Sequence, residues 1–217
     1  MRVRCLASLR YQVPCRLIHA SIVVIMAVVL NLAADLSYAQ TNRPLTLSEI
    51  RLERLSSGLN GGYGYKLQYL VRVPVENYWR FKTEFDGEHF LTNDELIGHR
   101  LVKSFGNSVI TENQYASAPG LTFLWKTTAY PKQYRLEFKL LNAEDSRHDF
   151  HYGSIQLIDA GEFTRVIQIA YFNFTGASLW VRYPWYGGMK STLTRVAMWE
   201  QKTALKYARP CRVARSF

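Results

Sequence analysis

Hydrophobic and polar residues alternate along the middle of the chain. Between Tyr134 and Leu140, every second residue is apolar and the residues between them are polar or charged. A period of two is typical of a β-strand with one face in the core and the other in water. The pattern predicts a first strand from Tyr65 to Val73 and further strands at residues 95–105, 108–116, 121–130, 133–140, 150–158 and 164–174.

Short turn sequences separate the strands predicted after residue 95. Gly106-Asn107, Pro131-Lys132 and the acidic, glycine-containing run at 159–162 are examples. Parallel neighbours need a long crossover, so these short gaps predict antiparallel pairing in chain order. We therefore expect a single meander whose apolar face needs a cover.

Three segments carry signals of helices. Thr46 and Glu49 have the spacing of a capping box and predict a short leading helix that runs to Leu55. Pro74 suits the first position of a helix, which we expect to end near residues 86–87. Only the segment at 188–207 is late, long and helical enough in period to cover the sheet.

The last predicted helix has a carboxylate on its apolar stripe. At 100° per residue, one side of this helix carries Met189, Leu193, Val196, Glu200, Thr203 and Tyr207. An unpaired carboxylate in an apolar interior costs several kcal/mol, so Glu200 must be paired, protonated or hydrated. Arg182, His99 or a tyrosine could pair with it. The helix could instead end or rotate near Trp199, which would bring Glu200 to solvent.

The first 39 residues have the features of an export signal. A basic leader precedes an uncharged run at 20–34, and small residues at Ser37 and Ala39 suit a signal peptidase. We expect cleavage after Ala39 and a periplasmic or secreted mature chain. The uncharged run reaches roughly the lower limit of a membrane span, so an inner-membrane anchor formed by residues 20–34 is the alternative.

Composition indicates one folded domain stabilised by packing. The chain has 217 residues, of which 48% are hydrophobic, enough for one well-cored domain but short for two. After cleavage only Cys211 would remain, so no disulfide can form within the mature chain. The net charge is +10, and the C-terminal end is basic, with Lys202, Lys206, Arg209, Arg212 and Arg215. We expect residues 208–217 to form a tail that is solvated or contacts an anionic membrane surface.

The sequence lacks the motifs of several chemical classes. His89, His99, His148 and His151 have no known metal-ligand spacing, and no Gly-x-Ser-x-Gly is present. We therefore expect no metal, no cofactor and no hydrolase chemistry. Export also removes nucleic acid from the expected partners.

Three stretches of the chain resemble known structural signatures. They are residues 71–79 followed by Asp86, residues 153–157 with Gly161 and 164–166, and the aromatic lead-in at 180–188. Together they are similar to the opening, the late hairpin and the start of the last helix of the START-like (SRPBCC) superfamily, which includes polyketide cyclases and lipid-transport proteins. The resemblance covers roughly Tyr65 to Leu205.

This resemblance implies an α+β helix-grip fold. A curved antiparallel sheet of about seven strands would wrap around the long C-terminal helix and leave a cavity for an apolar ligand. The START-like domain would occupy residues 65–207, after a leading helix and glycine-rich linker at 40–64. The superfamily has no universal catalytic residues, so the resemblance alone assigns none here.

Aromatic residues with polar tips suit a pocket that holds a large apolar ligand and orients it with a few polar groups. The candidate ligand-binding residues are Trp79, His99, Trp125, Tyr152, Tyr171, Trp180, Arg182, Tyr183 and Glu200. The expected function is that of an exported binding protein for a hydrophobic small molecule or lipid. One alternative is a polyketide cyclase or dehydratase that uses Glu200 with a tyrosine or histidine as its acid–base pair. Another is a domain without ligand that contacts proteins or membranes through its surface.

Overall fold

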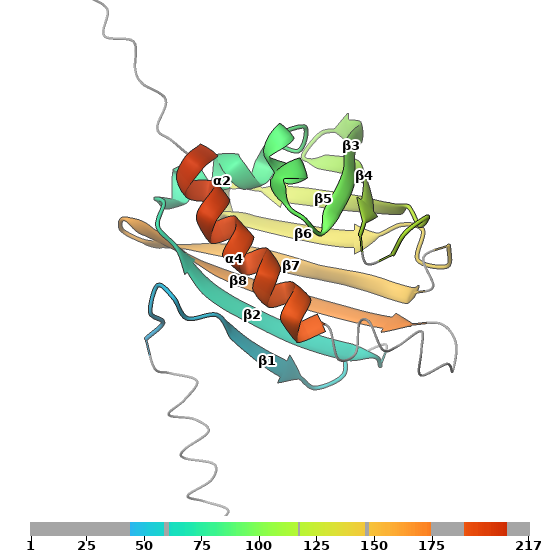
Figure 1. Cartoon of the computed structure of the whole chain (residues 1–217), viewed down its shortest axis with the longest axis horizontal. Coiled ribbons are helices and arrows are strands. Elements are labelled where there is room, and N and C mark those ends of the chain that lie inside the picture. The colour runs from blue at the N-terminus through green and yellow to red at the C-terminus, as the bar shows by residue number, and fades with distance from the viewer. Residues whose placement is uncertain (1–43, 59–60, 117, 146–147, 175–188, 208–217) are drawn as a thin grey trace, which may run out of the picture. The chain divides into compact units, whose positions relative to one another are not determined.

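One antiparallel sheet of eight strands forms the framework of the described residues. The computed structural model describes residues 44–58, 61–116, 118–145, 148–174 and 189–207. The strands are β1 (Arg51–Leu55), β2 (Tyr63–Val71), β3 (Leu96–Phe105), β4 (Ser108–Tyr115), β5 (Phe123–Tyr130), β6 (Arg135–Leu140), β7 (His148–Ala160) and β8 (Phe163–Phe174). The helices are α2 (Val75–Thr83), the 3-10 turns η1 (Glu88–Thr92) and η2 (Pro131–Gln133), and α4 (Met189–Tyr207). Figure 1 shows α4 lying across one face of the sheet.

The predicted meander is confirmed. Strands β3 to β8 pair in chain order, and β2 pairs with β8, so that the sheet order is β1-β2-β8-β7-β6-β5-β4-β3. The strand ends differ from the prediction by two residues or fewer. The tight turn between β7 and β8 passes through Gly161, whose φ of +74° favours glycine.

The predicted leading helix is wrong. The Thr46 amide donates to Glu49 Oε2 at 3.3 Å, which is one of the two hydrogen bonds of a capping box. The Glu49 amide donates to the Thr46 carbonyl oxygen, so these residues close an isolated turn. The chain then continues as strand β1, which pairs with β2 in the register Leu52↔Leu67. Leu52 of this strand and Ile50, which precedes it, pack against the core. Tertiary pairing at the sheet edge thus adds an eighth strand to the seven predicted.

Helices α2 and α4 cover the core-facing side of the sheet. The core includes Val75, Tyr78 and Phe81 of α2, which pack with Ala197 and Ala204 of α4. Helix α2 ends at Thr83, before the predicted end, and the unpredicted η1 turn follows it. The α4 side chain Trp199 donates to Thr92 Oγ1 at 3.0 Å, which ties α4 to η1.

Several predictions fall on residues outside the described ranges. They concern the signal peptide at 1–39, the side chains Trp180, Arg182 and Tyr183, and the basic tail at 208–217 with Cys211. Within the described ranges, no helix combines the length and the apolar character needed to cross a membrane.

Candidate functional site

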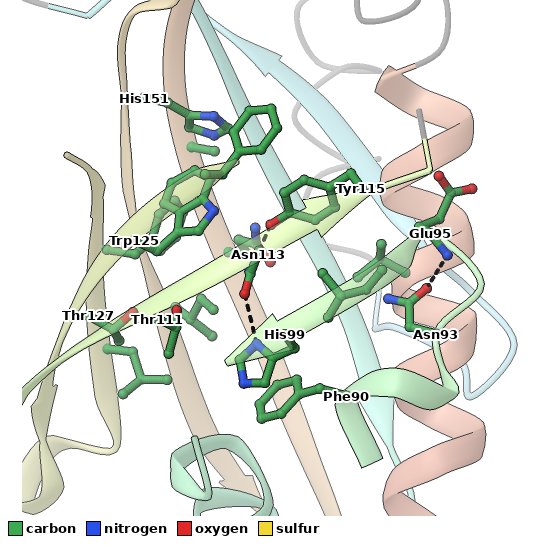
Figure 2. A pocket seen from close by; sticks show the side chains of 18 of the residues that line it. Phe90, Asn93, Glu95, His99, Thr111, Asn113, Tyr115, Trp125, Thr127 and His151 are labelled. Atoms are coloured by element: carbon green, nitrogen blue, oxygen red, sulfur yellow. Dashed lines mark hydrogen bonds between the residues drawn. The ribbon is translucent and has the colours of Figure 1, made fainter. Parts of the chain in front are cut away.

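A cavity of about 310 Å³ lies between the core-facing side of the sheet, α2, η1 and α4. This volume is at the lower end of the range of about 300–1,000 Å³ typical of ligand sites. The lining is mainly aromatic and aliphatic: Phe85, Phe90, Leu96, Phe123, Trp125, Leu136, Phe138, Ile155, Ala170, Phe172, Leu193, Val196 and Trp199. A smaller number of polar side chains interrupts it, several of which are labelled in Figure 2.

Strand register explains how these side chains come together. On β4 the lining residues are Thr111, Asn113 and Tyr115, which alternate as a period of two requires. The cross-strand pairs His99↔Asn113 and Thr111↔Trp125 continue the same face onto β3 and β5. β4 and β5 thus contribute every second residue to one wall, and His99 of β3 extends it.

Aromatic rings and two histidines form one part of the cavity. The ring of Trp125 meets that of His151 edge to face, at 4.9 Å between centroids, and His148 stacks on His151 at 5.6 Å. Burial, together with the neighbouring His148, lowers the pKa of His151 to about 3. His151 is therefore a neutral lining group near pH 7. Among the described residues, no cluster of three or more His, Cys, Asp or Glu side chains is placed to hold a metal.

A row of hydrogen bonds crosses β3 and β4 on another part of the wall. His99 Nε2 lies 2.7 Å from the Phe85 carbonyl oxygen, and His99 Nδ1 lies 2.7 Å from Asn113 Oδ1. Asn113 Nδ2 lies 3.0 Å from the Tyr115 hydroxyl. Figure 2 shows Asn113 between His99 and Tyr115. Burial raises the pKa of Tyr115, and the polar N–H groups of Asn113 and Trp125 oppose the rise.

Glu200 lies in the cavity wall and belongs to a hydrogen-bonded cluster. Its side chain is buried, and Lys82 Nζ donates to Oε1 at 2.6 Å. The Tyr69 hydroxyl donates to Oε2 at 2.5 Å, and the Tyr78 hydroxyl donates to the same oxygen. These bonds join α4 to α2 and β2. Glu200 therefore does not reach solvent, and of the partners considered from the sequence, tyrosine is the one observed.

The protonation states of this cluster follow from its partners. Burial alone would raise the pKa of Glu200, but the Lys82 charge and the hydrogen bonds from Lys82, Tyr69 and Tyr78 outweigh it and hold the pKa below its ordinary value. Burial and the nearby carboxylate raise the pKa of both tyrosines. Glu200 is thus an ionised acceptor held by two neutral hydroxyls and an ammonium group.

The predicted site residues divide into three groups. His99, Trp125 and Glu200 line the cavity. Trp79 does not line it; its ring packs edge to face on Tyr134. Tyr152 and Tyr171 pair with each other across β7 and β8 and do not line it either.

The alternation of side chains along a strand explains why Tyr152 and Tyr171 do not line the cavity. On β7, after the register shift between His148 and Phe150, the lining residues are His151 and Ile155, so Tyr152 points to the opposite face of the sheet. Tyr171 has the same phase because it pairs directly with Tyr152. Trp180, Arg182 and Tyr183 lie outside the described residues.

Sequence reasoning missed Lys82, Asn113 and Tyr115. Lys82 follows Tyr78 by one helical turn, so a prediction that placed Tyr78 in the core could also have placed Lys82 near that face. Asn113 and Tyr115 share the phase of Thr111 in a strand that was predicted correctly. Two polar residues on the core face of a strand were the available signal.

Comparison with known proteins identifies the fold. No family model and no curated protein sequence matches the chain. Among solved structures, the Zhui aromatase/cyclase from Streptomyces sp. R1128 is similar with a TM-score of 0.53 at 9% identity, over 73% of this chain and 94% of that one. Norcoclaurine synthase from Thalictrum flavum is similar with a TM-score of 0.51 at 9% identity, over 76% and 94% of the two chains.

A START superfamily protein from Mycobacterium smegmatis is also similar, with a TM-score of 0.50 at 11% identity, over 66% of this chain and 97% of that one. At these identities the likeness concerns the fold. The curved antiparallel sheet, the order of its strands and the long C-terminal helix agree with it. The chain therefore has the START-like (SRPBCC) helix-grip fold.

Proposed function

We propose that this chain binds a hydrophobic small molecule in the cavity between the sheet and α4. The observation that carries the proposal is the cavity itself, about 310 Å³ in volume and lined mainly by aromatic and aliphatic side chains. Such a lining with a few polar groups is typical of sites that bind apolar ligands and orient them. The volume favours a compact ligand with one or two rings over a two-chain lipid.

Proteins of the same fold support a ligand of this kind. Norcoclaurine synthase from Thalictrum flavum, which has a TM-score of 0.51 with this chain, has been solved in complex with dopamine and hydroxybenzaldehyde. Both are small aromatic molecules. A planar ring would contact the rings of Trp125, Phe138 and Phe172 in this cavity.

The Glu200 cluster favours binding over acid–base catalysis by this residue. A general base needs a lone pair that can reach the substrate, whereas both oxygens of Glu200 already accept hydrogen bonds from Lys82, Tyr69 and Tyr78. A general acid needs a proton, and the lowered pKa of Glu200 keeps it ionised near pH 7. We therefore assign Glu200 a structural role.

Filling the cavity is expected to abolish ligand binding. Ala170 is buried in β8 and lines the cavity, so Ala170→Trp would place an indole in the ligand space. We expect wild-type protein to bind N-phenyl-1-naphthylamine and increase its fluorescence. Ala170→Trp should bind this probe at least about tenfold more weakly, because the loss of about 1.4 kcal/mol of binding free energy lowers the affinity tenfold. Leu193→Trp on α4 should act in the same way.

Ala160→Trp is the matched control, because Ala160 is exposed at the end of β7. It should bind the probe as wild type does. Circular dichroism would establish that each variant is folded. Native mass spectrometry of wild-type protein taken directly from cells would identify the natural occupant. Equal binding by folded Ala170→Trp and wild type would contradict the proposal.

We further propose that the protein is exported, on the basis of the leader at 1–39. The mature protein isolated from cells should then begin at Gln40, which N-terminal sequencing can establish. Protein that begins at Met1 and stays membrane-bound would instead support an anchor at 20–34.

A further inference from the structure

The hydrogen-bond row of His99, Asn113 and Tyr115 restricts where its protons can lie. A carbonyl oxygen only accepts hydrogen bonds, so His99 Nε2, at 2.7 Å from the Phe85 carbonyl oxygen, carries a proton. His99 Nδ1 and the Tyr115 hydroxyl then lie at the two ends of the Asn113 amide, at 2.7 and 3.0 Å. An amide has one accepting end and one donating end, so its orientation is tied to the charge of His99.

Two arrangements satisfy these contacts. In the neutral arrangement, His99 Nδ1 accepts from the Asn113 NH₂ group and the Tyr115 hydroxyl donates to the Asn113 carbonyl oxygen. In the protonated arrangement, His99 Nδ1 donates to Asn113 Oδ1 and Asn113 Nδ2 donates to the Tyr115 oxygen, which are the contacts observed. The two arrangements differ by one proton and a rotation of the amide.

The protonated arrangement leaves the Tyr115 proton without an acceptor. Among the described residues, the Tyr115 side chain has one hydrogen bond, in which it accepts from Asn113. The indole N–H of Trp125 is buried and has no hydrogen-bond partner among the described residues. Tyr115 and Trp125 therefore present two unmatched donors beside the cavity that both residues line.

Unmatched buried donors are costly, and a ligand can remove the cost. A donor buried without a partner costs about 1–3 kcal/mol. A ligand oxygen that accepts from Tyr115 would recover that free energy only in the protonated arrangement. The aromatic walls on either side favour a planar group next to that oxygen.

We propose that Tyr115 recognises an acceptor oxygen of an aromatic carbonyl compound, and that His99 controls this recognition through Asn113. The inference rests on the proposed function and adds the ligand class. His99 is a positioning residue, since it acts on the ligand through Asn113 and Tyr115. Binding of such a ligand takes up a proton at His99, so its affinity rises as the pH falls.

Other charged groups near the cavity do not produce the same dependence. Lys82 of α2 pairs with Glu200 of α4, and Glu95 beside β3 pairs with Arg195 at 2.6 Å. His151 of β7 is neutral because its pKa is about 3, and burial lowers the pKa of His89 in η1. His148 stacks on His151 away from the row. Any contribution of these groups to the pH dependence of ligand affinity would persist when Tyr115 is replaced.

The experiment compares two naphthalenes of similar shape, 2-acetylnaphthalene with a carbonyl oxygen and 2-isopropylnaphthalene without one. Binding to the full chain would be measured by tryptophan fluorescence across about pH 5 to 8, the range in which histidines as a class change charge. We expect the acetyl compound to bind wild type more tightly at low pH. The affinity of the isopropyl compound should not change with pH.

Two variants separate the roles. Tyr115→Phe should lower the affinity for the acetyl compound about tenfold and the affinity for the isopropyl compound less than about twofold, because one hydrogen bond is lost. His99→Gln cannot take up a proton, so it should remove the pH dependence of acetyl binding. Tyr115→Phe is a conservative change, because phenylalanine keeps the ring that packs on Phe123.

The outcomes distinguish this inference from the proposed function. The inference would be overturned if Tyr115→Phe lowered the affinity for both compounds equally, or if the affinity of His99→Gln for the acetyl compound kept the pH dependence of wild type. The proposed binding function would stand in either case. If wild type bound neither compound and carried no small molecule when isolated from cells, both the inference and the proposed function would be overturned.

Discussion

Glu200→Ala is expected to lower the free energy of unfolding by about 3–5 kcal/mol. The substitution leaves the Lys82 ammonium group buried without its counter-charge, and the Tyr69 and Tyr78 hydroxyls lose their common acceptor. Removing one member of a buried ion pair costs more than the pair contributes, because the remaining charge keeps its desolvation penalty. Urea denaturation followed by circular dichroism measures the change.

A double-mutant cycle tests the cause of this loss. Lys82→Met should also be strongly destabilising, but Lys82→Met combined with Glu200→Ala should cost much less than the sum, because neither charge then remains. Arg100→Ala is the matched control, since its ion pair with Glu112 is exposed and should contribute less than about 1 kcal/mol. A loss in Glu200→Ala no larger than in Arg100→Ala would show that the cluster does not hold α4 in place.

The pH dependence of stability is a second readout of the same cluster. The folded state holds the pKa of Glu200 below its ordinary value of 4.5. A group with a depressed folded pKa contributes its stability above the unfolded pKa and loses it as the pH falls through the folded value. Wild type should therefore lose stability below about pH 4.5, and Glu200→Gln should lose less over that interval.

The meander was predictable because its signal is local. In β6, apolar residues such as Leu136 and Leu140 alternate with charged ones, and this pattern assigns both the strand and its buried face. β1 was not predictable in this way. Thr46 and Glu49, which precede β1, hydrogen-bond to each other in a short turn, and only pairing with β2 makes the following residues a strand.

The site was predictable only where strand phase was clear. On β7, Tyr152 and Ile158 alternate with Ile155 and Leu157, so both faces carry apolar residues and the sequence does not show which one faces the core. Tyr152 and Tyr171 were assigned to the wrong face for this reason. The stripe on its helix made burial of Glu200 one of two open alternatives, and its pairing with Lys82 depends on how α2 packs against α4. Such packing is a tertiary property that no local pattern specifies.

Gly153→Ala is expected to lower the free energy of unfolding by at least about 3 kcal/mol, at the upper end of the cost of overpacking. A Cβ at this position of β7 would lie 2.0 Å from the Ile169 carbonyl oxygen and 2.6 Å from Cζ of Phe138. Real Cβ contacts under 3.0 Å are essentially absent, so an atom must move. The Ile169 oxygen belongs to β8, which is held between β7 and β2 and cannot withdraw without breaking pairing.

Gly161→Ala separates this steric cost from the conformational cost of replacing glycine. Gly161 has open space around its missing Cβ but a φ of +74°, so alanine there should cost only about 1 kcal/mol. Because Phe138 also lines the cavity, any folded Gly153→Ala protein should bind N-phenyl-1-naphthylamine more weakly, whereas Gly161→Ala should bind it as wild type does. Equal stability losses in the two variants would mean that β7 does not need this close approach. A larger loss at Gly153, together with weaker binding, would show that one glycine lets the sheet close around the cavity.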